Sequence, residues 1–206
     1  MKKVLIIAML AFFGMTQAQV TFKPGLRGGV NFSHFTKGDE YNGYYDNNRN
    51  YVNGVYRDEF SSKTDFYLGF YGALHLTKYY TLQPEIDYSR QGAEYKGRLG
   101  EADFTYEVSY LSIAVVNKFT FSDKFNIHVG PTIDIQVEDN FPTENEIDFA
   151  FILGAGYNFT KNFGIEARVK KGIIPVIDSY TDTFYGGNDH TNVVFSVGAT
   201  YTFDLK

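Results

Sequence analysis

Charged side chains recur inside segments where apolar and polar residues alternate, and their spacing decides what they can do together. Glu85 and Asp87 lie two positions apart, as do Glu166 and Arg168, and residues two apart on an extended chain point to the same face. Charges that share an enclosed face must be paired, because an isolated buried charge is costly. We predict one internal charge network, formed by Lys23, Arg27, Glu85, Asp87, Asp134, Glu166, Arg168 and Lys170. A plug of salt bridges is the favoured interpretation, and a gated path for small ions is the alternative.

The histidines do not form a catalytic set. His34, His75, His128 and His190 all lack the serine two positions later that lipid A deacylases carry. Asp189 precedes His190 in a long connection, where we expect the pair to be solvated. The sequence therefore predicts no enzyme.

A calcium loop is also excluded. Asp46, Asn48 and Asn50 have its opening spacing, but Tyr51 replaces the required glycine and Arg57 replaces the bidentate acid. We expect no metal and no cofactor.

A polar segment near the N-terminal side of the chain is rich in tyrosine interleaved with asparagine. Tyrosine among small polar residues gives an adhesive surface at low entropic cost. The segment is a candidate binding loop for an envelope protein of unknown identity, and a loop without a partner remains the alternative. Its tyrosines are Tyr41, Tyr44, Tyr45, Tyr51 and Tyr56.

Period-two alternation dominates the rest of the chain. From Phe125 to Val137 every odd position is apolar or proline and every even position is polar or glycine. This run of thirteen alternating residues is long enough to cross a membrane as a tilted strand, which needs about 9–11 residues. Comparable segments predict eight strands, which start near Phe22, Phe66, Leu82, Phe104, Phe125, Ile147, Phe163 and Asn192. In the segment 104–119 the apolar parity changes, and a bulge near Ser109 would reconcile the two halves.

The connections alternate in length. Long links are expected at about 34–63, 96–103, 138–146 and 173–190, and short turns near 77–79, 120–123 and 160–162. This is the arrangement of bacterial outer-membrane barrels. A soluble lipocalin-type barrel is the alternative. Two features favour a membrane barrel: aromatic residues lie at the strand ends, and charged residues share a face with glycines. The predicted fold is all-β, an eight-stranded antiparallel up-and-down transmembrane β-barrel.

The first residues predict export. Lys2 and Lys3 precede a short apolar stretch, and Thr16-Gln17-Ala18 supplies small residues for cleavage. We expect a signal peptide over 1–18 and an outer-membrane β-barrel domain over 19–206. The chain contains no cysteine, so disulfides are excluded, and its net charge of −5 argues against a nucleic-acid partner.

The last strand resembles the signal that the barrel-assembly machinery reads. A polar residue, a spaced glycine and two aromatics on one face are supplied by Ser196, Gly198, Tyr201 and Phe203. Outer-membrane lipids and this machinery are therefore the expected partners.

Nearly the whole mature chain resembles the PorT-like family of outer-membrane β-barrel proteins. The resemblance runs from Gly25 to Phe203 and is sharpest over Leu82–Ala93. Tyr110–Val116 is similar to the family's fourth strand, although Ala114 stands where proline is usual. The founding member is associated with protein secretion and gliding, which need not hold for every relative.

These observations predict a non-enzymatic integral outer-membrane protein with a structural or interaction role in the cell envelope, within an envelope or secretion assembly. A narrow porin-like channel for small solutes or ions is the alternative.

Overall fold

The computed structural model describes residues 20–37, 41–45, 49–56, 60–96, 102–122, 124–178 and 189–204. The expected signal peptide over 1–18 lies outside these residues. The described chain forms strands β1 Thr21–Phe35, β2 Tyr41–Tyr45, β3 Tyr51–Tyr56, β4 Phe60–His75, β5 Tyr80–Tyr95, β6 Phe104–Thr120, β7 Phe125–Asp139, β8 Ile147–Asn158, β9 Phe163–Asp178 and β10 Asp189–Thr202.

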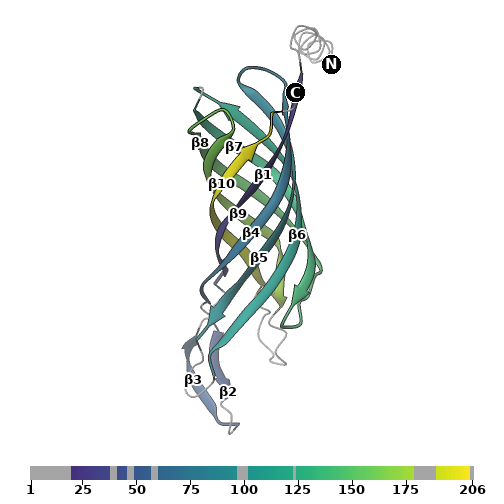
Figure 1. The fold of residues 1–206 in the computed structure, drawn as a ribbon. Coiled ribbons are helices and arrows are strands. Elements are labelled where there is room, and N and C mark those ends of the chain that lie inside the picture. Colours follow the sequence, from purple (N-terminus) through teal and green to yellow (C-terminus); the bar gives the residue numbers. More distant parts are fainter. Residues whose placement is uncertain are drawn as a thin grey trace, which may run out of the picture.

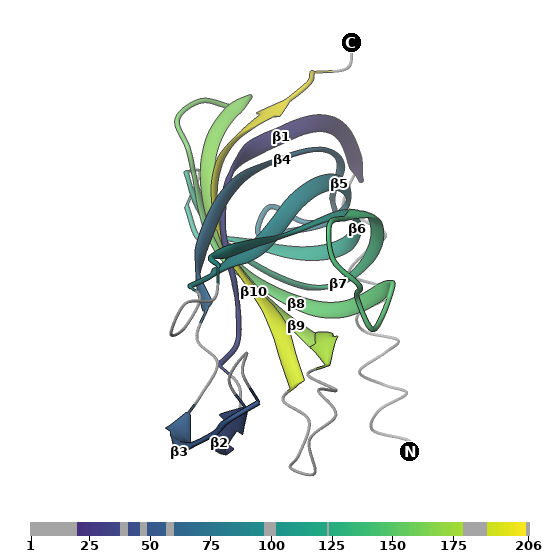
Figure 2. The same ribbon diagram turned by 90° about the horizontal axis from the view of Figure 1, so that it is seen from below.

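Eight of these strands close into one barrel. Strands β4 to β10 pair in chain order, and β1 pairs with both β4 and β10, every pair being antiparallel. Figure 2 looks into the closed ring, and Figure 1 shows the strands tilted along its wall. The predicted eight-stranded up-and-down barrel is confirmed. No helix among the described residues is long and apolar enough to cross a membrane.

The two faces of each barrel strand have opposite chemistry. On β8 the outward side chains of Phe151 and Leu153 are 59% and 60% exposed, although both are apolar. On β5 the inward Gln83 and Glu85 are almost fully buried. Soluble proteins bury apolar side chains and expose polar ones, so this inversion indicates a barrel whose outer wall meets lipid.

The connections follow the expected alternation. Short links at 76–79, 121–124 and 159–162 join strands at the end where β1 begins and β10 ends. The link predicted at 34–63 differs from expectation, because β1 extends to Phe35 and β4 begins at Phe60. Between them β2 and β3 form a separate two-stranded hairpin, which projects beyond the opposite end of the barrel (Figure 1). We call this opposite end extracellular, because outer-membrane barrels place their longer loops there.

The bulge expected near Ser109 does not lie on β6, because β6 pairs with β5 without a register shift. The pairing of β6 with β7 does shift between Ser109 and Tyr110, and the extra residue is Val137 of β7. The apolar residues of β6 before Ser109 therefore keep the inward parity of Ser112 and Ala114, whereas the expected bulge would have turned them outward. Val108 and Tyr110 face the interior and are buried. They belong to an apolar cluster at the extracellular end of the lumen, formed by Phe35, Ala93, Val108, Tyr110, Phe141 and Val176. We call it the apolar cluster below.

The face assignment predicts where a charge blocks assembly. Leu153→Arg should destabilise the barrel by about 2–4 kcal/mol, because the substituted side chain meets hydrocarbon. Val55→Arg is the matched control, because Val55 is similarly exposed, at 67%, but lies in the hairpin outside the barrel. The measurement is the shift in gel migration between boiled and unboiled protein, followed by urea unfolding in lipid vesicles. Equal loss of the folded band in both variants would contradict the assignment.

Candidate functional site

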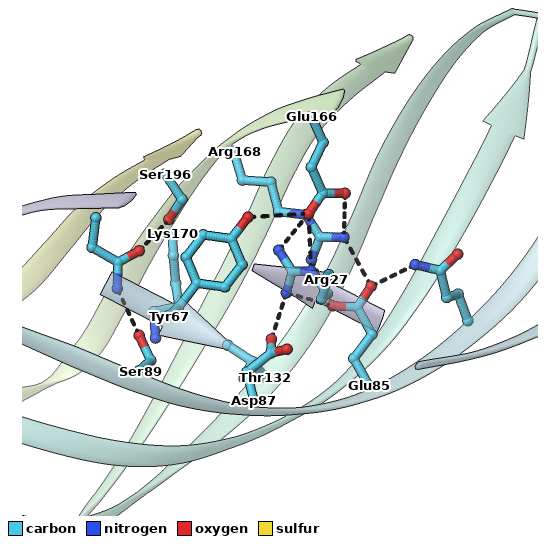
Figure 3. A network of polar contacts seen from close by, with 12 residues as sticks. Arg27, Tyr67, Glu85, Asp87, Ser89, Thr132, Glu166, Arg168, Lys170 and Ser196 are labelled. Carbon is cyan, nitrogen blue, oxygen red and sulfur yellow. Dashed lines mark hydrogen bonds and ion pairs between the residues drawn. The ribbon is translucent and has the colours of Figure 1, made fainter. Parts of the chain in front are cut away.

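Arg27 of β1 is the centre of the charge network in the lumen. Its Nε and Nη2 atoms donate to Glu166 Oε1 of β9 over 2.9 and 2.6 Å. Its Nη1 atom donates to Glu85 Oε2 over 3.0 Å and also to Asp87, both on β5 (Figure 3). The Arg27 side chain is only 4% exposed, so one guanidinium links three carboxylates in the interior of the barrel.

Arg168 of β9 completes the group. Its Nη1 and Nη2 atoms contact the two Glu85 oxygens over 2.6 and 2.8 Å, a bidentate pair. Nη2 also donates to Glu166 Oε2 over 3.0 Å. Gln83 also donates to Glu85 Oε1 over 2.7 Å. We call Arg27, Glu85, Asp87, Glu166 and Arg168 the ion cluster.

The register of the strands explains why these side chains can meet. Gly69 of β4 pairs with Arg27 on one side and with Asp87 on the other. A Cβ atom on Gly69 would lie 1.8 Å from Asp87 Oδ1. Gly154 of β8 pairs with Arg168, and a Cβ atom there would lie 2.8 Å from the Arg168 Cγ atom. Glycines on the neighbouring strands thus leave the space that the long side chains occupy.

Tyr67 of β4 is part of the site, and the sequence analysis missed it. The Arg27 guanidinium lies 4.7 Å from the centre of the Tyr67 ring, a cation–π contact. The Tyr67 hydroxyl lies 3.5 Å from Glu166 Oε1. The sequence could have indicated this position, because Tyr67 lies between the outward-facing Phe66 and Leu68 and therefore points into the barrel.

A second ion pair lies apart from the ion cluster. Lys170 contacts Asp134, and Thr132 donates to Asp134 over 3.1 Å. A cavity of about 30 Å³ is lined by Lys170, Asp87 and Arg168 together with the Ser112 hydroxyl. A space of this size takes one or two water molecules. A small polar cavity thus lies between the ion cluster and the Lys170–Asp134 pair.

Lys23 does not join the ion cluster, contrary to the prediction. It lies at the rim of the barrel at the short-turn end, where its Nζ atom contacts Asp204 Oδ1 over 2.6 Å. Hydrogen bonds from Lys23 and Asn162 lower the pKa of the Asp204 carboxyl below its usual value. Parity placed Lys23 on the correct face but gave no information on its partner.

Lys118 of β6 is a further internal cation that the sequence analysis did not name. The side chain interacts electrostatically with Glu166 and Glu85, although no hydrogen bond or ion pair to it is present in the described part of the chain. The ion cluster holds two guanidinium groups and three carboxylates. The ion cluster thus has one carboxylate more than it has guanidinium groups.

The residues of the expected assembly signal lie along β10 and just after it. Ser196 faces inward and donates to Asn31 Oδ1 over 2.8 Å. Gly198 shares this inward parity. Tyr201 and Phe203 are exposed on the outer wall, with ring centres 5.2 Å apart.

The candidate binding loop coincides with the hairpin. Tyr41 pairs with Tyr56 and Tyr45 with Tyr51 along the backbone, and the Tyr51 side chain is exposed. The side chains of Tyr41, Tyr44, Tyr45 and Tyr56, and residues 46–48 of the rejected calcium loop, lie outside what the structure describes.

His190 is buried, so the expectation of a solvated Asp-His pair is wrong for its histidine. The ring lies edge-on to Phe60, with centres 4.9 Å apart, and Nδ1 lies 2.7 Å from the Thr36 carbonyl oxygen. The Asp189 side chain lies outside the described residues. Within the described residues, no group of three histidine, aspartate or glutamate side chains could hold a metal ion.

A closed eight-stranded barrel with an apolar outer wall and an ion-paired interior defines an outer-membrane β-barrel protein. Residues 17–178 match the model of one family, the outer membrane protein beta-barrel domain. The chain belongs to this family, which supports its location in the outer membrane.

Solved structures similar to the chain include three bacterial proteins. The outer membrane protein OprG from Pseudomonas aeruginosa is 13% identical, with 92% of this chain and 99% of that chain covered and a TM-score of 0.49. Neisserial surface protein A is 10% identical, with 90% and 100% covered and a TM-score of 0.49. Ail, the attachment invasion locus protein of Yersinia pestis, is 12% identical, with 88% and 99% covered and a TM-score of 0.45. No curated protein matches the chain.

Breaking the ion cluster should cost stability. Arg168→Ala leaves Arg27 as the one guanidinium for the three buried carboxylates of the ion cluster, and we expect a loss of about 3–5 kcal/mol. Arg168→Met combined with Glu85→Gln removes both charges and should recover much of that loss. Lys23→Ala is the control, because the exposed ion pair of Lys23 with Asp204 should contribute little to stability. Urea unfolding in lipid vesicles measures all three. If Arg168→Ala were no less stable than Lys23→Ala, the ion cluster would not stabilise the barrel.

Proposed function

We propose that the protein is a non-enzymatic outer-membrane β-barrel that serves a structural or interaction role in the cell envelope. The observation that carries the proposal is the closed lumen. The charged side chains of the ion cluster are all at most 9% exposed, and they connect β1, β5 and β9 across the interior. An eight-stranded barrel is just wide enough for side chains to fill it.

The ion cluster is one barrier to the passage of ions through the lumen, and the apolar cluster is a second. The apolar cluster occupies the lumen between the ion cluster and the extracellular end, where Phe35 packs edge-on against Phe141 with ring centres 6.2 Å apart. A small hydrated ion would have to displace both an apolar and a charged barrier. This argues against the narrow porin-like channel as the main role.

The interaction role rests on the hairpin. It forms a separate sheet beyond the barrel, with Tyr51 and Val55 exposed. Under this proposal the chain is a PorT-like protein whose first 18 residues direct export and whose last strand is read by the barrel-assembly machinery. The hairpin then contacts another protein of an envelope or secretion assembly.

The proposal excludes lipid modification. The described residues contain no His-x-Ser pattern, and the buried histidines His128 and His190 lie in different parts of the lumen. Lipid A from a deletion strain should therefore have an unchanged mass spectrum. A mass difference that the intact gene restores would establish an enzyme instead.

Conductance in planar bilayers tests the closed lumen. The wild-type protein should give no conductance steps. Arg168→Ala with Glu85→Ala should also stay silent, because the apolar cluster remains in series. A quadruple variant that also carries Phe35→Ala and Tyr110→Ala should open both the ion cluster and the apolar cluster, and it should produce conductance steps. The variant must first be shown to keep its heat-modifiable migration. Steps from the wild-type protein would favour the channel.

Replacement of residues 38–58 by a short Gly-Ser linker tests the interaction role. The barrel should still fold, because the hairpin is not paired with it, and heat-modifiable migration should be unchanged. Crosslinks to envelope proteins in native outer membrane should be lost. The control is replacement of the short turn Thr160–Asn162, which should leave the crosslinks in place. Crosslinks that survive removal of the hairpin would contradict the proposal.

A further inference from the structure

Lys171 of β9 has an unusual position on the outer wall. Among the described outward-facing residues of the barrel strands, it is the one charged side chain that stands between two exposed apolar ones, Val169 and Ile173. Its neighbour on β8 is the exposed Phe151. A lysine on a lipid-facing wall is costly near the bilayer midplane and tolerated near the headgroups. Its height on the barrel therefore matters.

Lys171 lies close to the extracellular edge of the lipid-facing band. It is eight residues from Phe163, the aromatic residue with which β9 begins. With a rise of about 3.3 Å per residue and a tilt of about 40°, this separation is roughly 20 Å along the barrel axis. The apolar band is about 25 Å tall. The flexible lysine stem can carry the ammonium group to the extracellular headgroups.

The backbone beside Lys171 is irregular and is fixed from inside the barrel. Lys171 pairs with Val193 but Pro175 pairs with Thr191, so β9 holds extra residues between these pairs. Asp148 Oδ1 accepts hydrogen bonds from the N–H groups of Ile173 and Ile174 over 3.2 and 3.0 Å. Bulges of this kind redirect side chains.

The bulge brings other polar groups next to the ammonium. Lys171 Nζ donates to Thr191 Oγ1. The Thr191 N–H group donates to Thr36 Oγ1 over 2.9 Å, and the two hydroxyl oxygens lie 3.5 Å apart. His34 is half-buried on the same outer face, across Val193 from Lys171. One ammonium, two hydroxyls and one imidazole thus lie together at the extracellular edge.

We infer that this patch binds the phosphate group of a lipid in the extracellular leaflet. The ammonium neutralises the phosphate charge, and the hydroxyls and the imidazole can donate hydrogen bonds to its oxygens. The exposed Phe151 and Val169 lie on the midplane side of Lys171, where the acyl chains of the same lipid would pack. A lipid satisfies both the charged and the apolar part of this surface, whereas free phosphate satisfies only the first.

The test measures lipid binding to the full-length protein in detergent by native mass spectrometry. The probes are bisphosphorylated lipid A, the same lipid A after removal of both phosphates, and inorganic phosphate. The wild-type protein should prefer the bisphosphorylated form. Lys171→Gln should weaken its binding about tenfold, Lys171→Arg should retain it, and Thr191→Val should weaken it to a smaller extent. Lys161→Gln, at the opposite end of the barrel, is the matched control and should bind as the wild type does.

Three results would overturn the inference: equal binding by Lys171→Gln and the wild type, equal binding of lipid A with and without phosphate, or displacement of lipid A by inorganic phosphate. Each variant is first checked for heat-modifiable migration. Removing a charge from a lipid-facing wall should not impair folding, so a loss of binding reports on the site.

Discussion

In hydrocarbon no water replaces a lost backbone hydrogen bond, and every strand that crosses the membrane needs a partner on both sides. The pairing of β1 with β10, from Gly25 with Thr202 to Phe35 with Asn192, removes the last free edge of the sheet. Closure then fixes the chemistry of the two faces. Because side chains alternate along each strand, one set must meet lipid and the other must fill the interior.

The filling of the interior follows from the small number of strands. Eight strands leave room for side chains but not for an open aqueous channel, so any charge placed there must find its partners within the lumen. Arg27 suits this position because its planar guanidinium presents five donors in a fixed geometry. Gly69 and Gly154 provide the space, since a Cβ atom at either position would collide with neighbouring side chains. The ion cluster thus depends on residues of five different strands, β1, β4, β5, β8 and β9.

Alternation in the sequence is sufficient to assign faces but not partners. It predicted the barrel and brought Arg27, Glu85 and Arg168 to one interior surface, because period two is a direct consequence of extended geometry. It misassigned Lys23, whose partner Asp204 lies beyond the last strand. The expected bulge near Ser109 was wrong for a related reason. An apolar residue that faces inward at the extracellular end, such as Val108, gives the same alternation as one that faces lipid. The hairpin was missed because two short strands outside the barrel carry little periodicity.

The two barriers in the lumen differ in the forces that hold them. The ion cluster depends on specific pairs, so the loss of one partner leaves a buried charge that must be compensated. The apolar cluster has no such dependence, because dispersion and burial are spread over many contacts among side chains such as Phe35 and Tyr110. A change in protonation or in ionic conditions would act on the first barrier and leave the second intact. Under the proposed function this arrangement is useful, because a closed barrel is a stable support for the loops and the hairpin that it presents.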